Sequence, residues 1–212
     1  GDGALELRIG FSFVSEKNAR ENLEAEMLGK SFAEVRSEAT ATWNDLLGRI
    51  RVEGGTEREK GLFYSSLYRS FLWPALRSDV NGEFTDVDGK VINPGFRYYT
   101  GPSYWDDYRN KLILLGMLAP DVAADVISSD TDKGEKRGGF MPTFFHGDHA
   151  SAFVAGTYLR GNRGFDVNRA YNLVLRSATV QGPSRPWLDE YIAKGYISEM
   201  DVENPVTWTV CK

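Results

Sequence analysis

Apolar and polar residues alternate over residues 5–14 and then follow a helical period along most of the chain. The stretch LELRIGFSFV places apolar side chains at every second position, which predicts a β-strand. Between residues 31 and 50, apolar residues recur at helical spacing and form one stripe along a predicted helix. The pattern therefore predicts one strand followed by a largely helical chain.

Pairs of hydroxyl and carboxylate side chains mark the starts of two predicted helices. Ser31 with Glu34, and Thr56 with Glu59, have the spacing of a capping box, in which each side chain binds the backbone amide of the other residue. Pro74 is expected to end the second of these helices, because proline cannot continue the hydrogen-bonding pattern. Further helices are predicted to begin at or beside Ser15, Ser103, Pro120, Asp148, Asp166 and Pro186.

Two stretches are predicted to lack helix. Residues 77–102 contain the tight-turn pairs Asn81-Gly82 and Asp88-Gly89, which are typical of a loop or hairpin. Residues 130–139, DTDKGEKRGG, are expected to form a solvated turn. The elements do not alternate as βαβ units, and antiparallel helix pairs with aromatic loops at one end favour an α/α toroid or part of one.

Composition narrows the range of partners. The chain has 25 basic and 30 acidic residues, a net charge of −5 with no block of Lys or Arg, which argues against binding to nucleic acid or to an anionic membrane. It also lacks the run of about 18 apolar residues that a membrane helix needs. The single cysteine, Cys211, cannot form an internal disulfide, so the redox compartment stays open. An aromatic content of 13% fits a packed helical core as well as a sugar-binding protein.

The stretch GPSYWDDYRNK gathers aromatic, acidic and basic side chains where a loop becomes a helix. Trp105 can stack on the apolar face of a pyranose, while Asp106 and Arg109 can form charge-assisted hydrogen bonds to adjacent hydroxyls. The alternative is structural, because Asp106 lies three residues after Ser103 and can take part in helix capping. Both interpretations stay open from the residues alone.

The only two histidines of the chain, His146 and His149, lie in the tetrapeptide HGDH. Their spacing differs from the i, i+4 pair of a zinc-binding helix, and there is no third histidine, so zinc is not favoured. The structural alternative is that Asp148 caps the next helix and His149 lies in its first turn. A helix N-terminus favours the neutral imidazole, which donates one hydrogen bond and accepts another and so suits a sugar hydroxyl. We therefore expect HGDH and WDDYR to line one pocket, with His146 orienting the loop.

These motifs belong to a longer resemblance. In chain order, the stretches SFVSEKNARENLEAE, FYSSLYRSFLWP, YYTGPSYWDDYRNKLILLGMLAPDVAADVISS, GGFMPTFFHGDHASAFVAGTYLRGNRGFDVNRAY and RPWLDEYIAKGYIS resemble the α-mannosidases of glycoside hydrolase family 92. The resemblance covers nearly the whole chain, and W-D-x-Y-R and G-D-H-A are its most specific parts.

The resemblance implies a fold and a division of the chain. The family has an N-terminal β-sandwich, linker helices and an (α/α)6 catalytic barrel. Residues 1–14 would be the end of the sandwich, residues 15–55 the linker helices, and residues 56–212 the first part of a truncated barrel. The fold class is accordingly expected to be mainly α.

The resemblance also implies an activity. Members of the family are calcium-dependent, inverting exo-α-mannosidases that act on N-glycan-type mannosides, and they are mostly exported, which implies a periplasmic or secreted protein. The family's catalytic acid, base and calcium ligands lie in later segments, so no catalytic or metal-binding residue is assigned in this chain. The residues that carry over are substrate-binding ones: Trp105, Asp106, Arg109, Asp148 and His149.

Alternatives and partners follow from the missing catalytic groups. The chain alone is expected to be inactive, because inverting hydrolysis needs two carboxyls roughly 6.5–9.5 Å apart and the adjacent Asp106 and Asp107 do not suit that geometry. Asp86 and Asp88 are interpreted as turn residues rather than calcium ligands. The expected partners are a mannose-containing glycan and either the missing half-barrel or a second copy. The alternatives are a non-catalytic helical module that binds glycan or protein, and one chain of a split enzyme.

Overall fold

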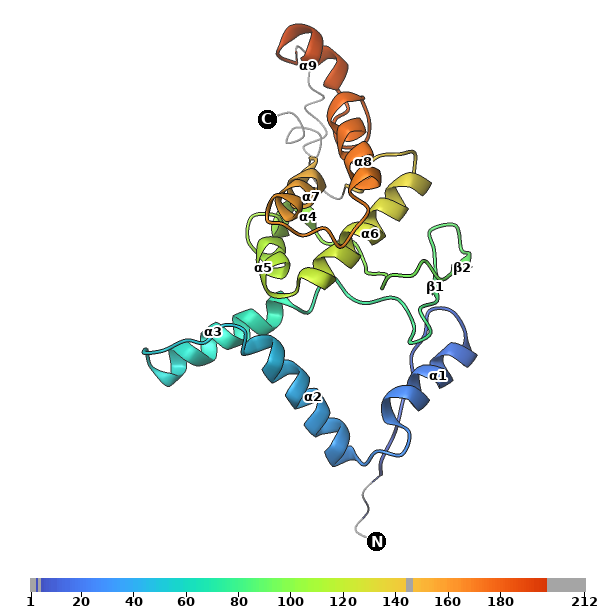
Figure 1. Ribbon diagram of the computed structural model, residues 1–212, viewed down its shortest axis with the longest axis vertical. Helices are drawn as coiled ribbons and strands as arrows, with labels where there is room; N and C mark the ends of the chain where they lie inside the picture. Colours follow the sequence, from blue (N-terminus) through green and yellow to red (C-terminus); the bar gives the residue numbers. More distant parts are fainter. Residues whose placement is uncertain (1–2, 4, 144–146, 198–212) are drawn as a thin grey trace. The chain divides into compact units, whose positions relative to one another are not determined.

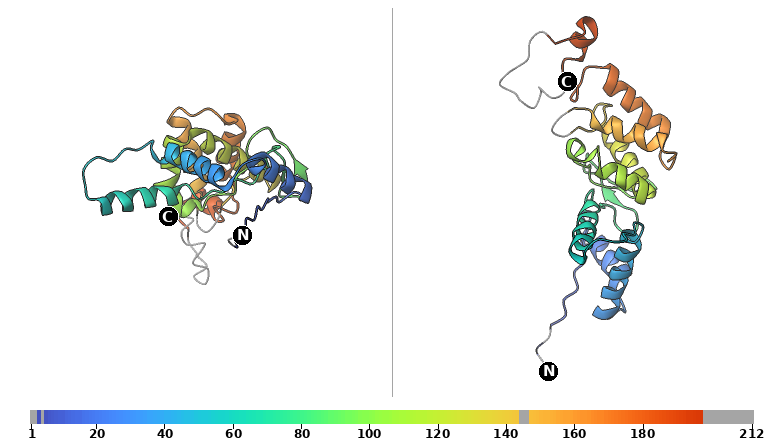
Figure 2. Two further views of the ribbon diagram at one scale, coloured as in Figure 1. Left: turned by 90° about the horizontal axis from the view of Figure 1, so that it is seen from below. Right: turned by 90° about the vertical axis from the view of Figure 1, so that its left-hand side faces the viewer.

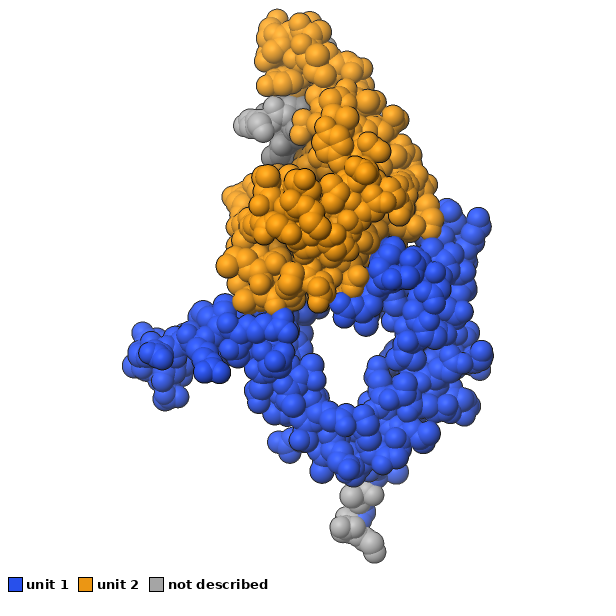
Figure 3. All heavy atoms as spheres, in the orientation of Figure 1, with its two compact units in different colours: residues 1–72, 76–97 blue, residues 73–75, 98–212 orange. Residues whose placement is uncertain are grey.

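The computed structural model describes residues 3, 5–143 and 147–197 and divides the chain into two compact units. Unit 1 comprises residues 1–72 and 76–97, and unit 2 comprises residues 73–75 and 98–212 (Figure 3). The described elements are mostly helices (Figure 1), which confirms the predicted mainly α class.

Unit 1 has three helices and a short hairpin. Its elements are α1 (Glu16–Met27), α2 (Phe32–Leu47), α3 (Glu57–Ser70), β1 (Phe84–Thr85) and β2 (Val91–Ile92). Both predicted capping boxes are present, at Ser31 with Glu34 and at Thr56 with Glu59. The hairpin is antiparallel, and Asp86 closes its turn by accepting hydrogen bonds from the amides of Asp88 and Lys90 at 2.9 and 2.8 Å. These local predictions were therefore confirmed.

The strand predicted over residues 5–14 is not formed. The segment is extended, but the Phe11 and Phe13 carbonyls accept hydrogen bonds from the side chains of Asn22 and Thr85, at 2.6 and 3.2 Å, instead of from a neighbouring strand. Gly10 lies so close to the Ala19 carbonyl on α1 that no side chain fits there. The alternating apolar residues are exposed: Leu5, Leu7, Ile9, Phe11 and Phe13. A strand needs a paired neighbour, and the described residues supply none. The assignment of residues 1–14 to the end of a β-sandwich stays a prediction.

Unit 2 contains most of the buried apolar residues. Its elements are α4 (Tyr104–Asp107), α5 (Lys111–Leu118), α6 (Pro120–Lys136), α7 (His149–Leu159), α8 (Val167–Thr179) and α9 (Leu188–Lys194). α6 packs against α5 and α8, and α7 packs against the same two helices (Figures 1 and 2). α9 ends at Gly195, whose φ of 76° is the left-handed conformation that glycine adopts readily. The core between these helices includes Leu112, Leu115, Ala123, Val126, Ile127, Phe153, Ala170 and Leu173.

Two predictions for unit 2 were wrong. The helix expected from Ser103 onwards is divided into α4 and α5, because the Asn110 side chain accepts a hydrogen bond from the Lys111 amide and starts a new helix. The solvated turn expected over residues 130–139 is instead helical as far as Lys136. Asp130 there is 1% exposed and pairs with Lys133, so its charge is balanced inside the protein rather than by water.

Candidate functional site

The first candidate segment forms α4 and the turn after it. Tyr104 is buried, whereas Trp105, Asp106 and Arg109 are exposed. The Ser103 hydroxyl donates to one Asp106 carboxylate oxygen at 2.5 Å, so the structural alternative for Asp106 is present. The other oxygen of Asp106 has no hydrogen-bond partner among the described residues, and a ligand hydroxyl could donate to it.

The second candidate segment leads into α7. Asp148 occupies the N-cap position, as predicted, but its side chain makes no hydrogen bond to a backbone amide there. Its carboxylate is 3% exposed, accepts a hydrogen bond from the Ser151 hydroxyl at 2.7 Å and pairs with the Arg185 guanidinium at 3.4 Å. Burial raises the pKa of Asp148, and the Ser151 hydroxyl and the Arg185 charge oppose that rise. His146, the other histidine of this segment, lies outside the described residues.

Aromatic stacking brings the two segments together. The rings of Tyr108 and His149 are stacked, with centroids 4.2 Å apart and planes inclined by 9°. The Arg109 guanidinium carbon lies 4.9 Å from the centroid of the same Tyr108 ring. His149 and Arg109, which are 40 positions apart in sequence, are thus linked through one tyrosine. Their role in binding sugar stays a prediction.

A cleft lies beside the residues that immediately precede the two candidate segments. It has a volume of about 430 Å³ and mainly apolar walls, formed by Trp73, Gly101, Pro102, Ser103, Tyr104, Pro142 and Thr143. The Trp73 indole donates to the Gly101 carbonyl at 3.1 Å, and the Thr143 hydroxyl donates to the Gly147 carbonyl at 2.7 Å. Both hydrogen bonds fix side chains at the rim. The cleft is large enough for a small ligand.

Sequence analysis assigns no role to three aromatic residues of this region. Trp73 stands in the stretch FLWP, where the proline was interpreted only as the end of a helix. Tyr104 and Tyr108 lie inside the candidate segment, but the helical pattern gives no sign that one is buried and the other stacks on a histidine. An excess of aromatic residues around a polar motif was the available signal.

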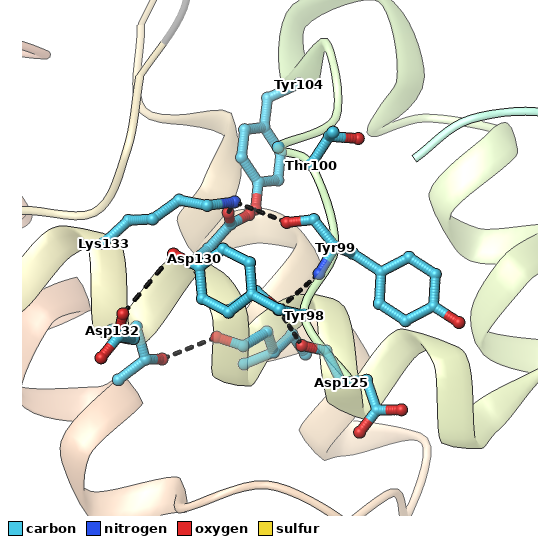
Figure 4. A network of polar contacts seen from close by, with 12 residues as sticks. Tyr98, Tyr99, Thr100, Tyr104, Asp125, Asp130, Asp132 and Lys133 are labelled. Atoms are coloured by element: carbon cyan, nitrogen blue, oxygen red, sulfur yellow. Dashed lines mark hydrogen bonds and ion pairs between the residues drawn. The ribbon is translucent and has the colours of Figure 1, made fainter. Parts of the chain in front are cut away.

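Behind α4 lies a buried polar network (Figure 4). The Tyr104 hydroxyl donates to the Asp130 carboxylate, and the Lys133 ammonium lies 2.8 Å from the same carboxylate. Burial, together with the negative charge of Asp130, raises the pKa of Tyr104 well above its usual range. The tyrosine hydroxyl therefore stays protonated and acts as a donor.

The described residues do not fit a metal site. No three His, Cys, Asp or Glu side chains of residues 3, 5–143 and 147–197 lie together in a way that could bind an ion. Asp86, which sequence analysis assigned to a turn, is occupied by backbone amides. Calcium binding by the whole protein thus stays a prediction. Within the same residues, no helix is long and apolar enough to cross a bilayer.

Comparison with known proteins gives a consistent answer. The family model described as the glycosyl hydrolase family 92 catalytic domain matches residues 18–211. The structure of the family GH92 α-mannosidase BT3965 from Bacteroides thetaiotaomicron is similar, with a TM-score of 0.77 and 28% identity over 85% of this chain and 25% of that chain. The family GH92 inverting mannosidase BT2199 from the same organism has a TM-score of 0.78 and 25% identity over 90% of this chain and 28% of that one.

A curated relative agrees with these structures. An uncharacterized secreted glycosidase from Arthroderma benhamiae is 26% identical over an alignment of 213 positions, which covers 96% of this chain and 24% of that protein. The chain thus spans about a quarter of the length of the relatives that it matches. Since the family model matches nearly the whole chain and its fold matches solved members, the chain belongs to glycosyl hydrolase family 92 and forms part of that family's (α/α)6 catalytic region.

Proposed function

We propose that the protein carrying this chain is an exo-α-mannosidase that hydrolyses terminal α-mannosidic bonds of N-glycan-type substrates with inversion. The chain would contribute part of the mannose-binding pocket. Family membership supports glycoside hydrolysis, and the identities of two similar structures, an α-mannosidase and an inverting mannosidase, support the narrower reaction. The observation that carries the proposal is the stacking of Tyr108 on His149, which joins the two sugar-binding candidates in one place.

Each exposed candidate has a role that its chemistry allows. Trp105, 37% exposed, would stack on the apolar face of the mannose ring. Asp106 would accept a hydrogen bond from a sugar hydroxyl through its unpaired oxygen, and Arg109 would donate to a neighbouring hydroxyl. His149, stacked on Tyr108, would exchange hydrogen bonds with a further hydroxyl.

Asp148 has a different role in this proposal. Its carboxylate is nearly buried and is bound to Ser151 and Arg185. It would therefore mainly orient the start of α7, which carries His149, and would offer the sugar only a small contact surface.

The catalytic carboxyls would come from outside this chain. Inverting hydrolysis needs an acid that protonates the glycosidic oxygen and a base that activates water, roughly 6.5–9.5 Å apart. Asp106 and Asp107 are consecutive residues of one short helix, and Asp107 is engaged with Lys111 at 3.4 Å. We therefore assign neither of them to catalysis, and no step of the proposal passes through calcium.

We also propose a completing partner and an exported location. The partner would be the remaining half-barrel or, for the chain alone, a second copy. The exposed apolar residues of α3 and α8, which include Leu62, Tyr171 and Leu175, support association. A secreted or periplasmic location is supported by the name of the fungal relative, a secreted glycosidase. Size-exclusion chromatography of the 212-residue chain should show oligomers, and a cooperative monomer would contradict the self-association.

The test is hydrolysis of an aryl α-mannoside by the full-length protein, with the product anomer followed by NMR. We expect β-mannose as the first product and no turnover by the 212-residue chain alone. Asp106→Asn should lower kcat/KM by about tenfold or more, whereas the adjacent Asp107→Asn serves as the matched control and should retain most activity. Release of α-mannose would contradict inversion, and turnover by the isolated chain would overturn the division of roles.

A further inference from the structure

Asp130 raises a question that the proposed function does not answer. Its side chain is 1% exposed, in the middle of α6, where its neighbours Ile127 and Val126 are apolar core residues. A buried carboxylate costs free energy unless it is paired, and apolar residues of similar volume are often as stable there. Asp130 is paired, with the Tyr104 hydroxyl and with Lys133 Nζ at 2.8 Å. The partners show what this charge does in the structure.

The same turn of α6 binds both ends of the segment 99–104 (Figure 4). At one end, the Tyr99 amide donates to Ser129 Oγ at 3.0 Å, and Lys133 Nζ donates to the Tyr99 carbonyl at 2.9 Å. At the other end, the Tyr104 hydroxyl donates to Asp130. We call Ser129, Asp130 and Lys133 the α6 clamp. Because one rigid helical turn binds both ends, the segment cannot shift independently of α6.

The segment that the clamp fixes leads directly into the candidate site. α4 has four residues, too few to be stable as an isolated helix. Tyr104 is its first residue, and Trp105 and Asp106 follow immediately. The Tyr104 ring also packs against Phe153 of α7, with centroids 6.3 Å apart, and α7 begins with His149. Tyr104 therefore contacts both the α6 clamp and the helix that carries the second candidate segment.

We propose that Asp130 and Tyr104 are positioning residues that fix Trp105 and Asp106 relative to His149 for binding of the terminal sugar. The inference rests on the proposed function. This role explains why a hydrogen bond is present where apolar side chains could also fill the core. The Tyr104 hydroxyl and the Asp130 carboxylate fix one orientation of the two side chains, which two apolar side chains would not do.

The test compares two single-hydroxyl deletions in the full-length protein. Tyr104→Phe removes the bond to Asp130. Tyr98→Phe is the matched control, because Tyr98 is also buried and its hydroxyl donates to Asp132 on the same helix, at 3.5 Å. The measurements are hydrogen exchange of the backbone amides of residues 103–108, steady-state kinetics on an aryl α-mannoside, and the thermal midpoint.

We expect Tyr104→Phe to speed amide exchange at residues 103–108 by about tenfold and to lower kcat/KM by about tenfold, the factor that corresponds to losing one hydrogen bond to a charged group. Tyr98→Phe should change both by less than about twofold. The thermal midpoints of the two variants should be similar. As a second variant, Asp130→Asn keeps an oxygen that can accept from Tyr104, and its effect on exchange should be smaller than that of Tyr104→Phe.

The outcomes separate this inference from the proposed function. Unchanged exchange at residues 103–108 in Tyr104→Phe would overturn the positioning role, whatever the activity. Faster exchange with unchanged kcat/KM in an active protein would also overturn it, because α4 would then not matter for the sugar. Absence of any turnover by the unmodified protein would instead reject the proposed function, while the exchange data still test the α6 clamp.

Discussion

Units 1 and 2 each contain a buried carboxylate that fixes a loop, but the donors differ. In unit 1, Asp79 is 8% exposed and accepts hydrogen bonds from Ser12 Oγ and Asn22 Nδ2, both at 2.7 Å. In unit 2, Asp130 is 1% exposed and binds a lysine ammonium and a tyrosine hydroxyl. Neutral donors tie an extended segment to α1, whereas an ion pair supports the segment before the candidate site. Two carboxylates that are both buried can therefore differ in what their loss costs, because one is bound by neutral donors and the other by a charged one.

Removing the carboxylate of Asp130 should have the largest effect on stability. Asp130→Ala leaves the Lys133 ammonium, whose side chain is 15% exposed, without its counter-charge. We expect the free energy of unfolding to fall by about 3–5 kcal/mol in chemical denaturation of the full-length protein. Asp132→Ala on the same helix removes a more exposed pair with Lys136 and should cost about 1 kcal/mol or less. Equal losses in the two variants would contradict the comparison.

His149→Ala tests whether unit 2 carries the function. If His149 binds the sugar as proposed, loss of that hydrogen bond should raise the barrier for kcat/KM by about 1.5–3 kcal/mol, with little change in the melting temperature. The measurement is kcat/KM of the full-length protein beside a thermal melt. If kcat/KM stayed the same and the melting temperature fell strongly, His149 would be a packing residue at the start of α7, and its stacking on Tyr108 would be purely structural.

Asp79→Ala should act on stability alone. It leaves the Ser12 hydroxyl and the Asn22 amide without their acceptor, which we expect to cost about 1–3 kcal/mol of unfolding free energy. Because Asp79 belongs to unit 1 and none of the candidate residues does, kcat/KM should stay within about twofold. A large loss of activity without a loss of stability would show that unit 1 contributes to the site.

Asp148→Asn should have the smallest effect on stability, and the size of that effect should depend on pH. The folded-state pKa of Asp148 is raised by burial, so between the usual value of about 3.9 and that raised value the folded protein binds more protons than the unfolded one. The free energy of unfolding of the unmodified protein therefore falls as pH rises through this window.

Asparagine does not titrate, so Asp148→Asn should be slightly more stable than the unmodified protein at pH 7. The gain should shrink as the pH falls toward about 4. Thermal melts over that pH range are the measurement. A gain that grew on acidification would contradict the raised pKa.

The features predicted correctly are those that depend on neighbouring residues. Both capping boxes join residues three positions apart, and the Asp88-Gly89 turn closes within a short hairpin, so the sequence contains all the interacting groups. The strand over residues 5–14 failed for the opposite reason. Its alternation is real, but a strand forms only with a partner, and hydrogen bonds from Asn22 and Thr85 replace one.

The candidate site was predictable in its parts but not in its assembly. WDDYR and HGDH each place a carboxylate and an aromatic group at the start of a helix, which indicates two candidate segments. Their proximity is only a hypothesis at the level of the sequence. The stacking of Tyr108 on His149 depends on how α4 and α7 pack, which helical periodicity does not specify. The charged residues around Asp130 favour a solvated turn in the sequence, and its partner Tyr104 lies 26 positions away.

The α6 clamp also limits which changes of length the chain can tolerate. One residue inserted in α6 ahead of Ser129 would rotate the following residues by about 100° and advance them by about 1.5 Å along the axis. Ser129, Asp130 and Lys133 would then leave Tyr99 and Tyr104 together, although no side chain had been substituted. An insertion beside Asp88, at the exposed tip of the hairpin, would disturb only the local turn that Asp86 closes. Related sequences should therefore vary in length at the hairpin and keep a constant count of residues within α6 from Pro120 to Lys133.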